Sequence, residues 1–172
     1  YILTVQQEIQ RLDKIVNNFL NYLRSEDLKK EQLEMNHLLD EVLHLYEREF
    51  SAANIEVQKD FADSFMVLAD EERIKTTFVN IIVNAIQAMP KGGKLKIESD
   101  AQNKEIRISD NGVGIAKKDL EHIFDVFYTT KQNGSGLGLP TAYKIIREHN
   151  ADMYINSKEQ KGTTVVIQWK EQ

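Results

Sequence analysis

The sequence has 172 residues, of which 41% are hydrophobic and 28% charged, so it is long enough for a buried core and too apolar for a disordered tail. Its 27 acidic and 22 basic residues give a net charge of −5, which argues against general affinity for nucleic acid or an anionic membrane. The absence of cysteine excludes disulfides, zinc ribbons, iron–sulfur clusters and a cysteine nucleophile within this chain. No apolar run approaches the roughly 18 residues of a membrane span. Because the chain begins at Tyr1 without a signal segment, we expect it to be a piece of a larger protein.

Residues 1–25 are predicted to form one helix with the seam of a coiled coil. Apolar residues recur in steps of three and four, at Ile2, Val5, Ile9, Leu12, Val16, Phe19 and Leu23. A single helix of this length is unstable in water unless it buries that stripe, either on its own domain or in a helical bundle, with a bundle between subunits favoured. Residues 25–30 are polar, so we divide the chain into a helical segment, 1–30, and a second domain, 31–172.

The second domain is predicted to be a two-layer α/β sandwich. Alternating and apolar runs predict strands at residues 32–35, 55–60, 65–68, 94–100, 105–110, 152–157 and 163–169. Helical periodicity predicts helices from an N-cap at Asn36 to about residue 53, and over residues 71–89, 117–124 and 139–150. Helices on a mostly antiparallel sheet of about five strands, rather than a regular βαβ repeat, give this fold class.

Two glycine clusters stand next to predicted elements. The first, Asp-Asn-Gly-Val-Gly-Ile at 110–115, follows a strand, and the second, Gly-Ser-Gly-Leu-Gly-Leu at 134–139, precedes a helix. Neither fits the P-loop or the dinucleotide-binding fingerprint. Glycines that open a helix expose backbone amides at its positive end, where phosphates bind. Each cluster alone also fits a structural turn.

A predicted buried helix carries unusual polar residues between the two clusters. Asn80 and Asn84 lie four residues apart and so share one helix face, among Ile81, Ile82 and Val83. Asparagine is a poor residue for a helix interior. The two side chains either bridge backbone groups, or one amide oxygen binds a hard cation such as Mg²⁺ together with phosphates and water.

Together these motifs resemble the GHKL ATP-binding fold, and within it the catalytic domain of bacterial sensor histidine kinases. Asn80 to Ala85 resembles the N box, Asp110 to Gly114 the G1 box, Phe124 to Phe127 the F box, and Gly134 to Leu139 the G2 box. The four boxes occur in the family's order. The first helix then resembles the second helix of the family's dimerisation and phosphotransfer hairpin, and the detail is reminiscent of the sporulation kinases.

The resemblance implies a site for ATP and Mg²⁺. Asp110 would accept a hydrogen bond from the adenine amino group, and Asn84 would be the metal ligand. Gln87 stands where many relatives carry lysine, so Lys131 either replaces that phosphate contact or is a solvated loop residue. Residues 128–134 would form a short lid. The implied ATP-binding residues are Asn80, Asn84, Gln87, Asp110, Gly112, Gly114, Ile115, Thr129, Thr130, Lys131, Gly134, Ser135, Gly136, Leu137, Gly138, Leu139 and Thr163.

Asn80 separates the candidate functions. In hydrolytic relatives a glutamate at this position activates water, and asparagine cannot act as a general base. We therefore expect ATP-dependent phosphorylation of a histidine and onward transfer to an aspartate. The alternatives are a GHKL-type ATPase, an anti-sigma-type serine kinase, or an interaction module with a degenerate pocket.

None of the four histidines, His37, His44, His122 and His149, precedes the sequence expected of a phosphoacceptor, which should lie upstream of Tyr1. We expect no catalytic residue in this piece and a cytoplasmic location. The expected partners are a response regulator or phosphorelay protein and, in the parent, a second subunit; nucleic acid is not expected. Whether the parent is membrane-anchored stays open.

Overall fold

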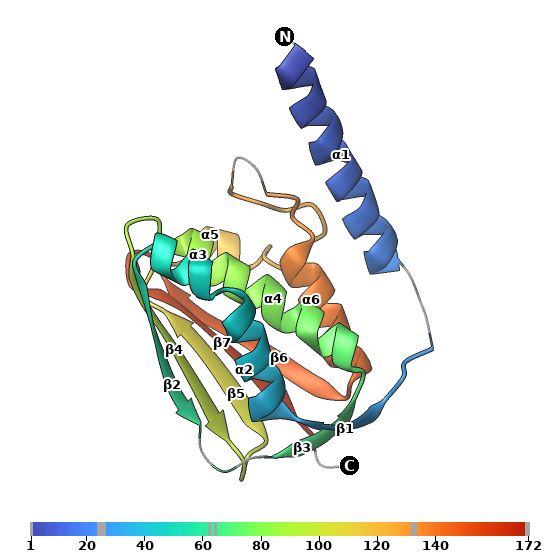
Figure 1. Ribbon diagram of the computed structural model, residues 1–172, viewed down its shortest axis with the longest axis vertical. Coiled ribbons are helices and arrows are strands. Elements are labelled where there is room, and N and C mark those ends of the chain that lie inside the picture. The colour runs from blue at the N-terminus through green and yellow to red at the C-terminus, as the bar shows by residue number, and fades with distance from the viewer. Residues whose placement is uncertain (1, 24–26, 62, 64, 132–133, 171–172) are drawn as a thin grey trace.

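The computed structural model describes residues 2–23, 27–61, 63, 65–131 and 134–170, and Figure 1 labels its elements. A sheet of five strands carries helices on one face, and helix α1 (Ile2–Leu23) extends beyond this body, which it contacts through a few side chains. The strand order is β2-β4-β5-β7-β6, with β2 and β4 parallel and the other neighbours antiparallel. The predicted two-layer α/β sandwich is therefore confirmed. The strands of this sheet are β2 (Ile55–Phe61), β4 (Gly93–Asp100), β5 (Glu105–Asp110), β6 (Ala151–Lys158) and β7 (Gly162–Trp169).

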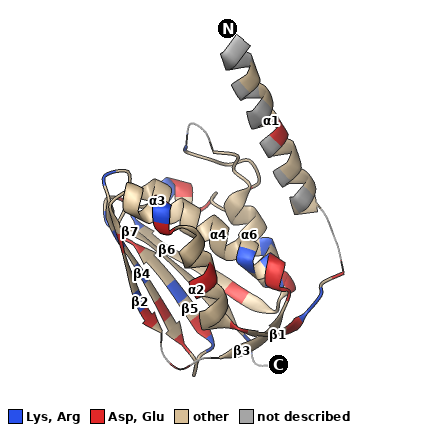
Figure 2. Cartoon of the chain, viewed as in Figure 1, with Lys and Arg blue, Asp and Glu red and all other residues tan. Residues whose placement is uncertain are grey.

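Two short strands, β1 (Glu31–Glu34) and β3 (Met66–Ala69), form a separate antiparallel pair at the start of the second domain. Figure 2 shows acidic and basic residues interspersed over the sheet and the helices. None of the helices that the structure describes combines the length and the apolar character that crossing a membrane requires. The helices after α1 are α2 (Met35–Leu45), α3 (Glu47–Ala52), α4 (Glu71–Ala88), α5 (Lys117–Leu120) and α6 (Gly138–Glu148).

Three predicted helix boundaries are wrong, each for a local reason. Asn36 is not the N-cap of α2, because the Glu34 carboxylate accepts the N–H groups of Asn36 and His37 at 2.9 and 2.7 Å. The helix predicted to reach residue 53 is divided at Tyr46, whose backbone leaves the helical region at φ −106° and ψ 10°. The helix predicted to reach residue 124 ends at Leu120, because the following residues form i→i+3 turns instead.

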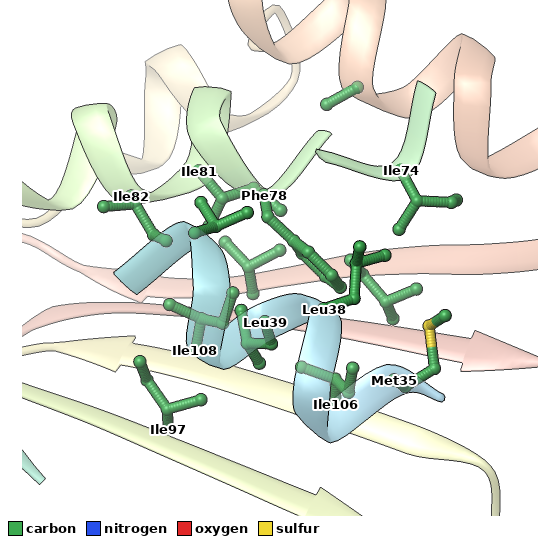
Figure 3. Packing of buried hydrophobic residues seen from close by; sticks show 14 of the residues in the cluster. Met35, Leu38, Leu39, Ile74, Phe78, Ile81, Ile82, Ile97, Ile106 and Ile108 are labelled. Carbon is green, nitrogen blue, oxygen red and sulfur yellow. The ribbon is translucent and has the colours of Figure 1, made fainter. Parts of the chain in front are cut away.

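The hydrophobic core lies between the sheet and the helices (Figure 3). Alternate residues of β4 and β5, among them Ile97, Ile106 and Ile108, point toward the helices, and Phe78 of α4 is completely buried against them. Burying a side chain of this size contributes about 1.5–3 kcal/mol. The apolar face of α4 is thereby fixed on the sheet, and its polar residues Asn80 and Asn84 are left on another face.

His149 ties the beginning of α4 to the end of α6. Its Nε2 accepts the N–H of Asp70 at 3.0 Å, and its Nδ1–H donates to the carbonyl of Ile145 at 2.7 Å, so both ring nitrogens are used in the neutral form. Burial lowers the pKa of His149, against the smaller opposing effect of the Ile145 carbonyl. Asp70 also caps α4 through the N–H of Arg73 and accepts the N–H of Lys29 from the linker. This cluster fixes where the chain enters α4.

Helix α1 has two apolar faces rather than the single predicted stripe. Phe19 contacts Phe127, with ring centroids 5.3 Å apart, and the Lys144 ammonium donates to the carbonyl of Tyr22 at 2.5 Å. Phe19 thus faces the second domain, whereas Leu20 joins the outer stripe. The side chains of Ile2 and Val5 lie outside what the structure describes. Among the described side chains of α1, the exposed large apolar residues are Ile9, Leu12, Val16, Leu20 and Leu23.

Candidate functional site

A cavity of about 570 Å³ lies between α4, the adjoining ends of β5 and β7, the loop that follows α5 and the beginning of α6. Ile15 of α1 completes its wall. Four segments that are distant in the sequence therefore meet at one place, as the motifs predict. The predicted site residues that line the cavity are Asn80, Asn84, Gln87, Asp110, Gly114, Ile115, Thr129, Thr130, Lys131, Gly134, Ser135, Gly136, Gly138, Leu139 and Thr163.

Two predicted site residues do not line the cavity. A Cβ at Gly112 would lie 2.3 Å from the carbonyl oxygen of Ala88, so this glycine lets the first glycine cluster pack on the end of α4. Leu137 is buried, with 1% of its surface exposed. Both residues shape the surroundings of the site rather than its surface.

Apolar residues missing from the sequence prediction form much of the wall. Ile108 could have been found from the alternation along β5, because it points to the same face as Ile106. Tyr128 begins the predicted lid, whereas no sequence signal indicates its partner Asp119, which accepts a 2.7 Å hydrogen bond from the tyrosine hydroxyl. The further lining residues are Ile15, Ile81, Val83, Ala85, Ala88, Val113, Ile123, Pro140, Ile155 and Val165.

Asp110 ends β5 and brings a carboxylate into this largely apolar cavity. Its Oδ1 accepts the N–H of Gly112 at 2.9 Å. Burial raises the pKa of Asp110, while hydrogen bonds from the backbones of Gly112 and Thr163 and the charge of Lys131 act in the opposite direction. A half-buried carboxylate with one oxygen fixed in this way presents an acceptor to an amino group of a ligand.

The polar face of α4 meets the loop that follows α5 through a single cation. The Lys131 ammonium donates to Oδ1 of Asn84 at 2.8 Å and to Oε1 of Gln87 at 2.6 Å. Lys131 remains partly exposed to solvent, and its side chain also lines the cavity. Desolvation there lowers the pKa of Lys131, against the opposing charge of Asp110. Both amide oxygens thus already bind a positively charged group.

The second glycine cluster brings backbone close to the cavity at the start of α6. Gly136 has φ 65°, and a Cβ there would lie 2.3 Å from the carbonyl carbon of Phe127. Phe127, itself at φ 69°, donates its N–H to the carbonyl of Gly136 at 3.0 Å. Gly138 begins α6 beside Asn80, so the positive end of this helix faces the polar side of α4. The arrangement suits a ligand with phosphate groups.

Comparisons with known proteins agree with this geometry. Sporulation kinase C of Bacillus subtilis (strain 168) is 34% identical over 97% of this chain, and sporulation kinase E of the same organism is 30% identical over 97%. The chain spans 40% and 23% of these two relatives. The solved catalytic domain of histidine kinase ThkA is 31% identical, with a TM-score of 0.73 over 82% of this chain and 95% of that domain.

A larger structure, of ThkA in complex with the response regulator TrrA, matches 98% of this chain and 50% of that chain at a TM-score of 0.80 and 29% identity. The isolated ThkA domain covers a smaller share of this chain, 82%. The family model described as histidine kinase-, DNA gyrase B- and HSP90-like ATPase matches residues 69–172, which contain α4, both glycine clusters and the cavity-lining ends of β5 and β7. The chain therefore belongs to this ATPase family, with solved histidine kinase catalytic domains among its structural relatives.

Proposed function

We propose that this chain is the catalytic, ATP-binding part of a sensor histidine kinase, with residues 1–30 contributing the second helix of its phosphotransfer hairpin. The observation that carries the proposal is the polar face of α4 opposite the second glycine cluster, with Asn80 four residues before Asn84. The only carboxylates among the described cavity-lining residues are Asp110 and Asp119. Neither carboxylate stands four residues before Asn84, where hydrolytic relatives carry the glutamate that activates water. This difference favours transfer of the phosphoryl group to a protein over hydrolysis.

The cavity assigns a role to each part of the nucleotide. The Asp110 carboxylate would accept a hydrogen bond from the adenine amino group. This contact discriminates against guanine, because the guanine carbonyl would place a second acceptor opposite the carboxylate. The N-terminus of α6 and the amides of the second glycine cluster would hold the phosphates. Residues 128–134 would close over them; residues 132 and 133 of this lid lie outside the described chain.

Mg²⁺ fits the site only together with the nucleotide. Asn84 offers one hard amide oxygen, and among the described residues no group of three or more His, Cys, Asp or Glu side chains could hold an ion by itself. Phosphate oxygens and water would supply the other ligands. The ion would neutralise charge on the transferring phosphoryl group, while the protein contributes positioning.

The proposed partners follow from α1 and from the relatives. The exposed stripe from Ile9 to Leu23 suits a helical bundle with an upstream helix and a second subunit. ThkA has been solved with a response regulator, and the sporulation kinases are relatives, so we include a response regulator or a phosphorelay protein as the receiver. The domain would work in the cytoplasm.

The test is the fate of γ-labelled ATP when this chain is mixed with a hairpin that carries the upstream histidine. We expect acid-labile phosphate on the hairpin, and Asn84→Ala should abolish it if the amide oxygen binds the metal. Free phosphate without labelled hairpin would favour an ATPase. Acid-stable phosphate on a partner would favour a serine kinase.

A further inference from the structure

The ammonium of Lys131 occupies a cation position on the residue that we assign to Mg²⁺. It lies 2.8 Å from Oδ1 of Asn84 and 2.6 Å from Oε1 of Gln87, both distances typical of charge-assisted hydrogen bonds. The two acceptors lie on successive positions of one face of α4. Lys131 therefore places a positive charge on the amide oxygens of this helix face.

The backbone around Lys131 is held, so its side chain is the part that can change partners. The Lys131 N–H donates to Oγ1 of Thr129 at 3.1 Å, and the N–H of Gly134 donates to the Lys131 carbonyl at 3.1 Å. A Cβ at Gly134 would lie 2.2 Å from the same Thr129 oxygen, so this turn requires glycine. The lysine side chain, in contrast, has four carbons and several rotatable bonds, so its ammonium can change partners while the turn keeps its hydrogen bonds.

We propose that Lys131 is an internal counter-cation that alternates with the divalent metal on Asn84. A metal ion and an ammonium on one amide oxygen repel each other, so the arrival of the metal displaces Lys131 from Asn84. Gln87 gives the ammonium a second acceptor on the same helix face. Without a divalent ion, Lys131 supplies the positive charge that the nucleotide phosphates require. This inference rests on the proposed function and deepens it.

Two other roles of Lys131 make different predictions. A lysine that only contacts the phosphates also contributes less in Mg²⁺, because the ion reduces the charge of the phosphates, but removing it leaves the side-chain amide of Asn84 unchanged in the absence of nucleotide. A solvated loop lysine affects neither nucleotide binding nor this amide. Only alternation with the metal on Asn84 combines a contribution of Lys131 that is large without Mg²⁺ and small with it with a change at the Asn84 amide when Lys131 is replaced.

The experiment measures the dissociation constant of a fluorescent ADP analogue, and of ATP by competition, in EDTA and in saturating Mg²⁺. We expect Lys131→Met to weaken binding at least about tenfold in EDTA, the factor typical of one lost charge-assisted contact, and less than about threefold in Mg²⁺. Lys131→Arg keeps the charge and should restore most of the affinity in EDTA. Lys118→Met, an equal charge change at an exposed residue of α5 outside the cavity, is the matched control.

Gln87→Leu tests the second acceptor without altering the metal ligand. Because it removes one of two contacts of the ammonium, it should weaken binding in EDTA less than Lys131→Met does, and it should weaken binding more in EDTA than in Mg²⁺. The side-chain amide resonances of Asn84 and Gln87 report the contact directly, and both should shift in Lys131→Met without nucleotide.

Equal losses in EDTA and Mg²⁺ would overturn the alternation, as would no loss in either condition. In both cases nucleotide binding by the wild-type chain, and its enhancement by Mg²⁺ through Asn84, would leave the proposed function standing. Absence of nucleotide binding by the wild-type chain would overturn the proposed function, and the inference with it.

Discussion

Two glycines of the second cluster should respond in opposite ways to alanine. At Gly136 the backbone has φ 65°, which costs an L-residue about 1–2 kcal/mol, and the added Cβ would lie 2.3 Å from the backbone of Phe127. Relieving such a contact in packed structure costs a further ~1–3 kcal/mol. At Gly138, the first residue of α6, the Cβ would lie 3.4 Å from Oδ1 of Asn80, which is ordinary contact. Alanine is also the better helix former, by up to about 1 kcal/mol.

We therefore expect Gly136→Ala to lower the free energy of unfolding by about 2–5 kcal/mol, and Gly138→Ala to leave it unchanged or raise it by up to about 1 kcal/mol. For a chain of this size, the first change corresponds to a fall in Tm of roughly 5–15 °C. Thermal and urea unfolding monitored by circular dichroism measure both. Equal stability of the two variants would refute the reasoning, because it would show that Gly136 is not constrained by Phe127.

Three further outcomes are expected. Asp110→Asn should weaken adenine nucleotide binding about 10- to 150-fold, the equivalent of 1.5–3 kcal/mol for a lost hydrogen bond to a charged group, as titration calorimetry would show, while a purely structural role would leave affinity intact. Burial lowers the pKa of His149 below its ordinary 6.5, so the stability that neutral His149 contributes should be complete above pH 6.5 and should decline as the pH falls below 6.5. Urea unfolding at a series of pH values should show this decline, and His149→Asn should make the pH dependence flatter. Phe127→Gly removes the ring that contacts Phe19 but suits φ 69°, so proteolysis should cleave the linker after α1 faster while Tm stays nearly constant; protection as in the wild type would count against the contact.

The sequence predicted the sheet and the central helix well because their signals are local. Alternation along 94–100 and 105–110 corresponds to β4 and β5, and the helix predicted over 71–89 is α4, which ends at Ala88 before Pro90. Helix ends were less predictable where side chains compete. Asn36 is a good cap by residue type, but the Glu34 carboxylate reaches two backbone N–H groups and starts α2 earlier.

The site itself was predictable as a set of motifs but not as a set of contacts. The order of the four motifs predicted that their polar residues share one site, and these residues do line one cavity. It could not show that Gly112 serves packing against Ala88, because that depends on how closely the end of α4 approaches the first glycine cluster. Nor could it pair Lys131 with Asn84 and Gln87, which lie 47 and 44 residues away in the sequence.

The position of α1 joins the helical segment to the cavity through Phe127. The Phe127 ring contacts Phe19 of α1. The Phe127 backbone N–H donates to the carbonyl of Gly136, which lies two residues before the start of α6. Ile15, one helical turn before Phe19, lines the cavity directly. Helix α1 is therefore in contact with the cavity at two places: Ile15 forms part of the wall, and Phe19 packs on the residue whose backbone is hydrogen-bonded to the glycine turn.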